Sequence, residues 1–599
     1  MTAEVTDAEE ATRGGTSFLE AVARRLRSLV RRSEFSLVIL AALVGIAAGL
    51  SVALVGTLSS DLHNILFGLT GERLSGVKTL HKGFVAPILG GVVLGVGAWM
   101  WNRRRSTIPV DPIEANALHG GRMSLRDSLW VTAQTLLSNG FGASVGLEAG
   151  YAQVGAGLAS KLGSMLRLRR NDLRMLVGCG AGGAIGAAFG APLTGAFYAF
   201  ELIVGTYTVA SAAPILVASL AGVLTARAVR ATTYVIHAPA TGVLNLSDYL
   251  SVILLGLLCA GLGIVVMRAV YLLERAFDWS RLPKAVRPAI GGCAIAGMAL
   301  ITPQILAAGH GALTVDIPAR LTMTALLFLI AMKAAASVVS LGSGFRGGLF
   351  FASLFLGALM GKLFYVVLAL IAPQLSIDQT LCILVGMASL AVAVVGGPLT
   401  MSFLVLETTG DFAVTSIVLA AALVTSLTVR ETFGYSFSTW RLHLRGETIR
   451  SAIDVGWMRM LTVGRMMRRD PATIPADASL KELRRRYPLG STQRVVVVDS
   501  GGGYKGVALI SEAFASADRP DEDADRTAVD IAHWADVALT PEMNVKEAVA
   551  IFDRTESEAL AVIESAADRK VLGLLTEGYA LRRYSEELDK ARQGLTGGG

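Results

Sequence analysis

One short motif occurs twice in the chain, as Gly190-Ala191-Pro192-Leu193-Thr194 and as Gly396-Gly397-Pro398-Leu399-Thr400. A glutamate follows each proline nine positions later, Glu201 in the first copy and Glu407 in the second. A glycine also precedes each proline by twelve positions, so these features are all offset by 206 residues. The repeat predicts two related halves, at about residues 34–230 and 249–434.

Both copies lie in apolar, glycine-rich sequence. Of the 599 residues, 53% are hydrophobic and 17% are charged, and the mean hydropathy is +0.56; an average soluble protein is about 25% charged. About 30% of the 155 residues from Arg445 onward are charged, against about 12% of the 444 residues before it. We therefore expect a membrane body followed by a soluble tail. This composition excludes a disordered chain, a collagen and a nucleic-acid-binding domain as the main identity.

Several apolar runs are long enough to cross a bilayer core of about 30 Å. They are residues 35–58, 85–101, 215–229, 250–270, 326–339 and 354–371. Other apolar segments, including both copies of the repeat, are too short or too rich in glycine for a simple span. Their free backbone groups must be satisfied within the protein or at a water-filled cavity. Broken helices at matching positions of two halves point to the binding site of a transporter.

The segment Gly146-Leu147-Glu148-Ala149-Gly150 places a carboxylate inside apolar sequence. An ionisable residue at membrane depth is costly, so it is a functional candidate. The glycines allow backbone N–H groups to converge, and a helix N-terminus there would suit an anion. Because a carboxylate resembles a bound anion, Glu148 could occupy such a site and leave it when protonated. The alternative is a glutamate that only caps a helix.

Four loops follow one another in a fixed order. They are Arg105-Ser106-Thr107-Ile108-Pro109, Gly146 to Gly150, Gly348-Leu349-Phe350-Phe351-Ala352 and Gly434-Tyr435-Ser436-Phe437. With these loops and the repeat the chain resembles the CLC chloride channel and transporter family, and together with the charged tail described below the resemblance covers nearly the whole chain after residue 34. The resemblance implies an α-helical polytopic membrane protein of two related halves with broken helices, a CLC-like inverted repeat. It also implies a homodimer in which each subunit has its own anion pathway.

The resemblance assigns Glu148 as the gating glutamate and surrounds the anion with neutral groups. The implied anion-binding residues are Ser106, Ile108, Gly146, Leu147, Leu349, Phe350 and Tyr435. Chloride is large and weakly hydrated, so neutral donors can hold it without trapping it. A full lysine or arginine contact would bind it too tightly for rapid release, since conduction needs weak or multi-site binding on exit.

The loops depart from the family's pattern. Arg105 and Thr107 replace both glycines of the first loop, and the second and third loops lack the family's proline. In proton-coupled members an internal glutamate collects protons from the cytoplasm, and that position falls here on Leu202, one residue after Glu201. Leucine cannot relay a proton, so either Glu201 or water substitutes, or anions move without stoichiometric proton exchange. Glu201 and Glu407 are equally interpretable as structural anchors between helices.

The charged tail alternates short strands with amphipathic helices. The first unit has a helix at 479–487 and strands at 493–499 and 506–511, and the second has a helix at 545–553 and strands at 559–564 and 571–576. The tail resembles an α/β pair of cystathionine-beta-synthase-type (CBS) domains. We place a connector at 446–459, CBS-like domains at 460–516 and 526–586, and a flexible tail at 587–599, after a membrane domain at 34–445.

Paired CBS domains commonly bind adenine nucleotides in this family, through a Ser or Thr followed three residues later by Asp. Here Phe514 follows Ser511 and Tyr579 follows Thr576, so neither copy has the aspartate. We therefore expect no cofactor, and a dimerising or mechanically coupled tail. The four cysteines occur singly in apolar sequence, and neither they nor the histidines form a metal-binding motif.

The net charge is +7, and many of the basic residues lie beside apolar segments, as do the five arginines between residues 24 and 32. This is the positive-inside pattern of a membrane protein, so no nucleic-acid partner is expected. We expect no signal peptide. The N-terminal segment (1–33) and the CBS pair are expected in the cytoplasm, and the protein itself in the plasma (inner) membrane of a prokaryote.

The expected function is transport of chloride, or of another small monovalent anion, through a channel-like or loosely coupled pathway gated by Glu148. The first alternative is a proton-coupled chloride/proton antiporter, and the second is an exporter of fluoride or another anion. An intramembrane enzyme is disfavoured because the seven histidines form no HExxH or nucleophile motif. A divalent-cation transporter would need clustered carboxylates, which the membrane body lacks.

Overall fold

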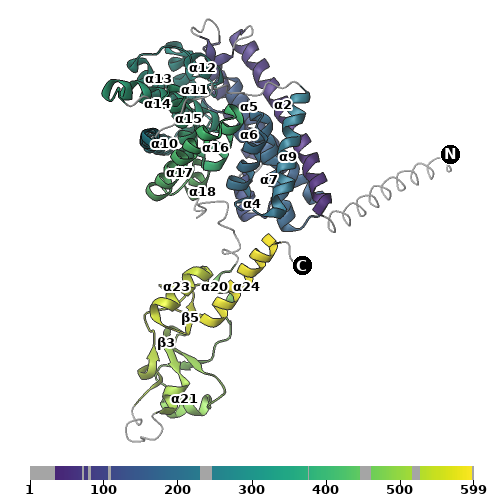
Figure 1. Ribbon diagram of the computed structural model, residues 1–599. Coiled ribbons are helices and arrows are strands. Elements are labelled where there is room, and N and C mark those ends of the chain that lie inside the picture. Colours follow the sequence, from purple (N-terminus) through teal and green to yellow (C-terminus); the bar gives the residue numbers. More distant parts are fainter. Residues whose placement is uncertain are drawn as a thin grey trace, which may run out of the picture. The chain divides into compact units, whose positions relative to one another are not determined.

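The computed structural model describes residues 34–69, 73–77, 83–104, 109–229, 246–374, 377–444, 461–515 and 526–596. The chain divides between Asp454 and Val455 into two compact units. The first is built of helices, and the second combines strands with helices (Figure 1). This division agrees with the expected membrane body and charged tail.

The first half of the helical unit runs from α2 to α9. Its elements are α2 (Glu34–Phe67), α3 (Ala86–Arg104), α4 (Pro112–Leu118), α5 (Leu125–Gly140), α6 (Glu148–Met165), α7 (Arg170–Phe189), α8 (Pro192–Tyr198), the π-helical turn η2 (Ala199–Val204) and α9 (Val209–Ala228). Short 3-10 turns lie in both halves at η1 (Leu74–Gly76) and η3 (Pro303–Ile305).

The second half repeats this succession from α10 to α17. Its elements are α10 (Leu246–Trp279), α11 (Arg287–Ile301), α12 (His310–Asp316), α13 (Met323–Gly342), α14 (Phe350–Ile371), α15 (Gln379–Val395), α16 (Pro398–Thr409) and α17 (Phe412–Thr432), and α18 (Phe437–Leu444) follows them. Six helices of the described chain, α2, α9, α10, α13, α14 and the one that begins at Phe412, are long and apolar enough to cross a membrane.

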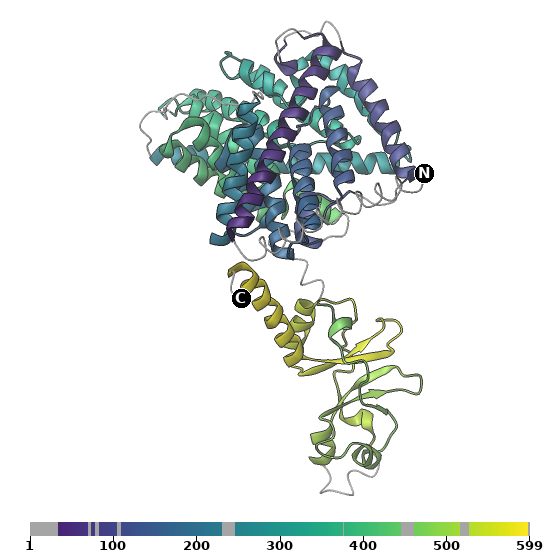
Figure 2. The ribbon, with the colours of Figure 1, turned by 90° about the vertical axis from the view of Figure 1, so that its right-hand side faces the viewer.

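The helices of each half pack in the same pairs. In the first half α6 packs on α7, α7 on α9, and α2 on α9 and α7; in the second half α14 packs on α15, α15 on α17, and α10 on α17 and α15. Figures 1 and 2 show α2, in purple, lying alongside the other helices of its half. The prediction of two related halves is confirmed by this shared pattern of contacts.

Glycine and proline break the helices where the repeat predicts. Gly190 ends α7 in the left-handed region, with φ of 67°, and Pro192 is the first residue of α8. In the second half Gly396 and Gly397 have φ of 87° and 75°, and Pro398 begins α16. Proline suits a first helical position, where its missing N–H costs nothing, and glycine adopts positive φ without a steric penalty. The repeated sequence therefore encodes a repeated helix–break–helix corner.

The glycines twelve positions before each proline mark two close helix crossings. A Cβ atom at Gly180 would lie 2.2 Å from the carbonyl oxygen of Gly155, which joins α7 to α6. A Cβ atom at Gly386 would lie 2.3 Å from the carbonyl oxygen of Gly357, which joins α15 to α14. Small residues let helix backbones approach closely within membranes. Both halves therefore depend on a glycine pair at the same crossing.

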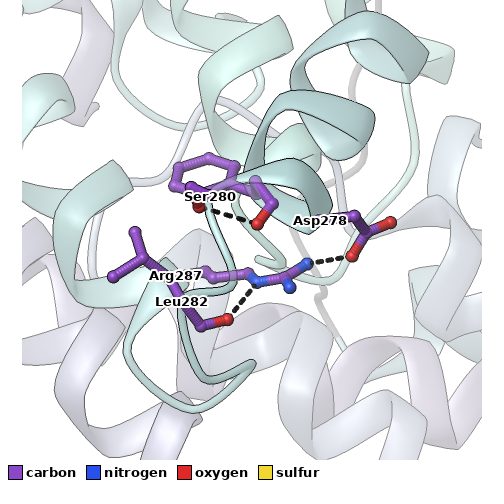
Figure 3. A network of polar contacts seen from close by, with 5 residues as sticks. Asp278, Ser280, Leu282 and Arg287 are labelled. Carbon is purple, nitrogen blue, oxygen red and sulfur yellow. Dashed lines mark hydrogen bonds and ion pairs between the residues drawn. The ribbon is translucent and has the colours of Figure 1, made fainter.

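The turn between α10 and α11 is held by one arginine. Arg287 Nε donates to the carbonyl oxygen of Leu282 at 3.1 Å, and its NH1 pairs with Asp278 at 2.7 Å (Figure 3). The Ser280 hydroxyl donates to the carbonyl oxygen of Phe277 at 2.7 Å. The serine bond satisfies a carbonyl in the last turn of α10, as a helix C-terminus requires, and the arginine ties that end of the helix to the following turn.

The second unit contains two sheets. The four-stranded sheet has the order β1 (Thr473–Pro475), β2 (Arg494–Val498), β3 (Tyr504–Leu509) and β4 (Ala532–His533), with β1 parallel to β2 and the other pairs antiparallel. The other sheet pairs β5 (Ala559–Ile563) with β6 (Val571–Thr576) in antiparallel fashion. The helical elements are α20 (Val463–Met466), α21 (Leu480–Arg486), α22 (Ile510–Ala515), η4 (Ala528–Ile531), α23 (Val545–Thr555) and α24 (Glu577–Thr596).

The helix and two strands predicted for each unit of the tail are confirmed, as α21, β2 and β3 and as α23, β5 and β6. The short strands β1 and β4 have too few residues to show an alternating pattern. Two further differences concern boundaries. Leu461, Val463 and Met466 pack in the apolar core of the second α/β unit, and α24 continues to Thr596, across most of the segment expected as a flexible tail.

A test of the close crossings compares two glycine substitutions in helices. We expect Gly386→Ala to destabilise the protein by about 1–3 kcal/mol, because the new Cβ atom would overlap backbone atoms of α14. Gly261→Ala in α10 is the matched control, since no atom lies within 4 Å of its Cβ position. Alanine there should be neutral or stabilising through its helix propensity. Thermal unfolding in detergent measures the stability of both variants. Equal melting temperatures for the two would contradict a stabilising role of the close crossing between α14 and α15.

Candidate functional site

A cavity of about 170 Å³ lies where segments of both halves meet in the helical unit. Its walls come from the chain before α4, from α5, the start of α6, the end of α8, the loop before α14, the end of α15 and the start of α18. The lining residues include Pro109, Asp111, Thr135, Glu148, Gln153, Tyr198, Arg346, Leu349, Phe350, Val395, Phe437 and Ser438. The cavity therefore brings together residues from all four loops singled out in the sequence.

Two of these loops pair directly with each other. Gly146 N–H donates to the Gly348 carbonyl oxygen at 2.8 Å, and Gly348 N–H donates to the Gly146 carbonyl oxygen at 3.1 Å. The two glycines are 202 residues apart, as are Glu148 and Phe350, the first residues of α6 and α14. The N-terminal ends of two long helices therefore start side by side. Each carries a partial positive charge, so the arrangement suits an anion.

Two serines hold the same loops from the other half. Ser340 accepts a hydrogen bond from the Ser144 N–H at 2.9 Å, and Ser138 accepts one from the Arg346 N–H at 2.9 Å. Ser138 and Ser340 are also 202 residues apart. Each half therefore accepts a hydrogen bond from a backbone N–H group in the broken segment of the other half. Such groups need a partner within the protein, because lipid offers none.

Glu148 is the first residue of α6 and its side chain is buried, with an exposed fraction of 4%. Its carboxylate accepts hydrogen bonds from the backbone N–H groups of Phe351 and of Glu148 itself. A Cβ atom at Gly146 would lie 1.9 Å from Glu148 Oε2, so only glycine leaves room for the carboxylate. The carboxylate thus lies at the N-terminal end of α14, where a diffusible anion would also be stabilised.

Leu349 and Phe350 line the cavity at the start of α14. The Phe350 ring packs on Phe189 and Tyr198, with ring centroids 4.8 Å and 6.3 Å away. Gly146 and Leu147, also expected at the anion site, are buried in the paired loop and are not among the lining residues. Ser106 and Ile108 lie outside the described residues.

Tyr435 is not among the lining residues of the cavity. Its ring packs on Trp440, with centroids 5.5 Å apart, whereas Phe437 and Ser438 line the cavity in its place. The reason is the helix register: Gly434 has φ of 89° and α18 begins only at Phe437, so the first helical turn faces the cavity. The sequence contains no signal for this register, and Tyr435 as an anion-binding residue stays a prediction that rests on the family resemblance.

Glu201 and Glu407 form a reciprocal carboxylate pair between the halves. Glu201 accepts hydrogen bonds from the N–H groups of Leu399 and Thr400, at 2.9 Å and 2.8 Å, and from the Thr400 hydroxyl at 2.6 Å. Glu407 does the same with the equivalent residues of the first half, at 2.7, 2.8 and 2.6 Å. Each carboxylate satisfies the free N–H groups at the start of the other half's helix.

This geometry favours the structural interpretation of Glu201. Both of its carboxylate oxygens already accept hydrogen bonds, and Leu202 beside it is a half-buried apolar side chain that lies near Gly396. A proton route through Glu201 stays a prediction. The stacked rings of Phe197 and Phe403, 206 residues apart in sequence, add an apolar contact to the carboxylate pair, with centroids 4.0 Å apart.

Sequence reasoning missed two cavity residues that it could have found. Arg346 is an ionisable residue in a glycine-rich loop, and the same cost argument that singled out Glu148 applies to it. Tyr198 lies four residues after Thr194, so one helical face carries both. Within the described residues, no group of three or more His, Cys, Asp or Glu side chains could hold a metal ion.

Comparison with known proteins gives a consistent family. A family model described as voltage gated chloride channel matches residues 90–430, and a CBS domain model matches residues 463–514. The voltage-gated ClC-type chloride channel ClcB of Citrobacter koseri is 26% identical over 407 residues, which cover 66% of this chain and 96% of that protein. The ClcB protein of Salmonella typhimurium is 26% identical over 405 residues, with the same two coverages.

Solved structures share the fold. A slow cyanobacterial Cl⁻/H⁺ antiporter superposes with a TM-score of 0.60 at 21% identity, covering 68% of this chain and 97% of that one. A CLC-type fluoride/proton antiporter has a TM-score of 0.55 at 20% identity, covering 66% and 96%. A eukaryotic CLC transporter has a TM-score of 0.55 at 18% identity and covers 92% and 98%, so its likeness extends into the second unit.

The reciprocal carboxylate pair can be tested by matched amide substitutions. We expect Glu201→Gln and Glu407→Gln each to lower the melting temperature in detergent, and by similar amounts. A hydrogen bond to a charged group contributes about 1.5–3 kcal/mol, and a glutamine NH₂ cannot accept from the helix N–H groups. Glu431→Gln is the control, because its side chain on α17 is 76% exposed. A lower melting temperature for only one of the two variants would contradict an equivalent stabilising role of the two carboxylates.

Proposed function

The chain belongs to the voltage-gated chloride channel (CLC) family, and from that premise we propose that it moves chloride, or another small monovalent anion, across a membrane with Glu148 as the gate. One observation carries the proposal: the Glu148 carboxylate lies in a cavity at the N-terminal end of α14, held by the Phe351 N–H. A group of one negative charge already occupies the position that the helix end favours for an anion.

The gate works by exchange between two anions. When the carboxylate is ionised, it takes the hydrogen bonds at the start of α14 and excludes the permeating anion. Protonation removes its charge, which weakens these bonds and frees the position. An anion bound there by backbone N–H groups is held without a full counter-charge, so it can leave again.

We further propose that anion flow is channel-like or loosely coupled to protons. Leu202 has no ionisable group, and the Glu201 carboxylate is engaged by Leu399 and Thr400. A chloride/proton antiporter is the second candidate, because a fold neighbour is described as a Cl⁻/H⁺ antiporter. Another fold neighbour is described as a fluoride/proton antiporter, so fluoride is the alternative anion to test.

The protein is an integral membrane protein of a family of channels and transporters, and no enzymatic activity is part of the proposal. We place it in the plasma (inner) membrane of a prokaryote, as its relatives are bacterial, with the N-terminus and the CBS pair in the cytoplasm. The arginines between residues 24 and 32 support this orientation.

We also propose a homodimer, as the family resemblance implies, with one pathway in each subunit. Exposed leucines at helical spacing on α9 and α17 leave apolar surface available; they are Leu216, Leu220, Leu224, Leu423 and Leu427. The CBS region acts as a dimerising or mechanically coupled module. It lacks the aspartate of the family's nucleotide sites, so no adenine nucleotide is assigned to it.

A flux assay on Glu148 tests the gate. We expect the wild-type protein in chloride-loaded liposomes to release chloride several-fold faster at low pH than at high pH, because protonation frees the site. Glu148→Gln resembles the protonated carboxyl group and should give flux that no longer depends on pH. Asp127→Asn, an acidic position near the start of α5 away from the cavity lining, is the control. A pH dependence that survives in Glu148→Gln would contradict the gate.

A second assay measures coupling. Chloride efflux is started with valinomycin while the outside pH is recorded, and we expect chloride release with no stoichiometric proton uptake. Leu202→Glu places a carboxyl group at the family's internal position, and proton uptake should then increase relative to chloride release. Stoichiometric uptake by the wild-type protein would establish the antiporter instead. If fluoride or nitrate leaves while chloride stays inside, the choice of substrate is contradicted.

A further inference from the structure

The anion cavity contains a positive charge that neutral-donor chemistry does not account for. Arg346 lines the cavity together with Glu148, Leu349 and Phe350, and its side chain is half-buried. Among the described residues that line the cavity, Arg346 is the cation, and Asp111 and Glu148 are the acidic residues. An arginine therefore lines the same cavity as Glu148.

The backbone at Arg346 is fixed from both sides. Its N–H donates to the Ser138 hydroxyl on α5 at 2.9 Å. The next residue, Gly347, has no room for a side chain, since a Cβ atom there would lie 2.5 Å from the Cβ atom of Val145. The loop cannot rotate without breaking these contacts. The arginine is thus placed at the cavity by a rigid loop that also carries Gly348 and the start of α14.

The equivalent position of the first half shows that the loop does not need an arginine. Ser144 lies 202 residues earlier, and its N–H makes the matching bond to Ser340. The Ser144 side chain is fully buried, with its hydroxyl 3.1 Å from the Ser337 hydroxyl. The backbone conformation of this loop is therefore compatible with a small neutral side chain. Of the two equivalent positions, only Arg346 carries a charge.

We propose that Arg346 is a specificity-determining residue that attracts and holds the permeating anion in this cavity. The inference rests on the proposed anion transport. A guanidinium group is weakly hydrated and always charged, and its five N–H donors can turn toward an anion. A cation that lines a narrow cavity raises the local anion concentration and the rate of capture. Asp111 and Glu148 oppose this field, which keeps the anion from being trapped.

This proposal revises the expectation that the anion meets neutral groups alone. Backbone N–H groups at the start of α14 still bind the ion at the gate. Arg346 acts on the anion as it enters the cavity that both residues line. Its removal should therefore raise the anion concentration at half-maximal flux more than it lowers the maximal flux.

The test measures unidirectional chloride flux into liposomes as a function of chloride concentration for the wild type, Arg346→Gln and Arg346→Lys. We expect Arg346→Gln to raise the chloride concentration at half-maximal flux by about fivefold or more, with a smaller change in maximal flux, as expected when a nearby charge is lost. Arg346→Lys keeps the charge and should recover most of the affinity. Arg126→Gln, an exposed arginine of α5 outside the cavity lining, should behave as the wild type.

A second set in the Glu148→Ala background separates action on the anion from action on the gate. If Arg346→Gln still weakens chloride affinity there, the arginine acts on the anion, as proposed. If the effect disappears, the arginine acts only through the Glu148 carboxylate and the proposal is overturned. It is also overturned if Arg346→Gln matches the wild type in both backgrounds. Wild-type protein that moves no chloride, bromide, nitrate or fluoride would instead remove the proposed function itself.

Discussion

Backbone groups freed by broken helices have no water to bind at membrane depth, and the whole helical unit is arranged around satisfying them. The two halves solve this problem for each other. Gly146 pairs with Gly348, the hydroxyls of Ser138 and Ser340 accept from opposite loops, and the reciprocal carboxylate pair binds the first N–H groups of α16 and α8. Neither half could keep its broken segments buried without the other.

The same pairings create the site. Because Gly146 and Gly348 are joined, the N-terminal ends of α6 and α14 begin next to each other, and their partial positive charges act on one small space. The close glycine crossings of α6 on α7 and of α14 on α15 keep these helices in place. A transport site built on backbone N–H groups needs such support, since the groups that bind the anion belong to the scaffold itself.

The residues that we propose to act on the anion are those at which the two halves differ. Glu148 begins α6, whereas Phe350 begins α14 at the matching position. Arg346 lines the cavity, whereas its counterpart Ser144 is a buried neutral residue. One half thus supplies the carboxylate that we propose as the gate, and the other supplies Arg346 and the helix end at which the carboxylate lies. The paired halves provide the geometry, and the side chains proposed to act on the anion differ between them.

Apolar runs, glycine–proline corners and an ionisable residue in apolar sequence are local features, so they predicted the membrane body, the broken helices and Glu148 as a candidate. The repeat offset by 206 residues predicted the two halves. The sequence also placed most helices and strands of the tail, where alternation is strong. Three features become visible only in the folded chain. Glu201 and Glu407 each bind the start of a helix in the other half, Phe437 lines the cavity whereas Tyr435 does not, and Arg346 lines it together with Glu148. These facts depend on register and on contacts about 200 residues apart in the chain, which no local pattern encodes.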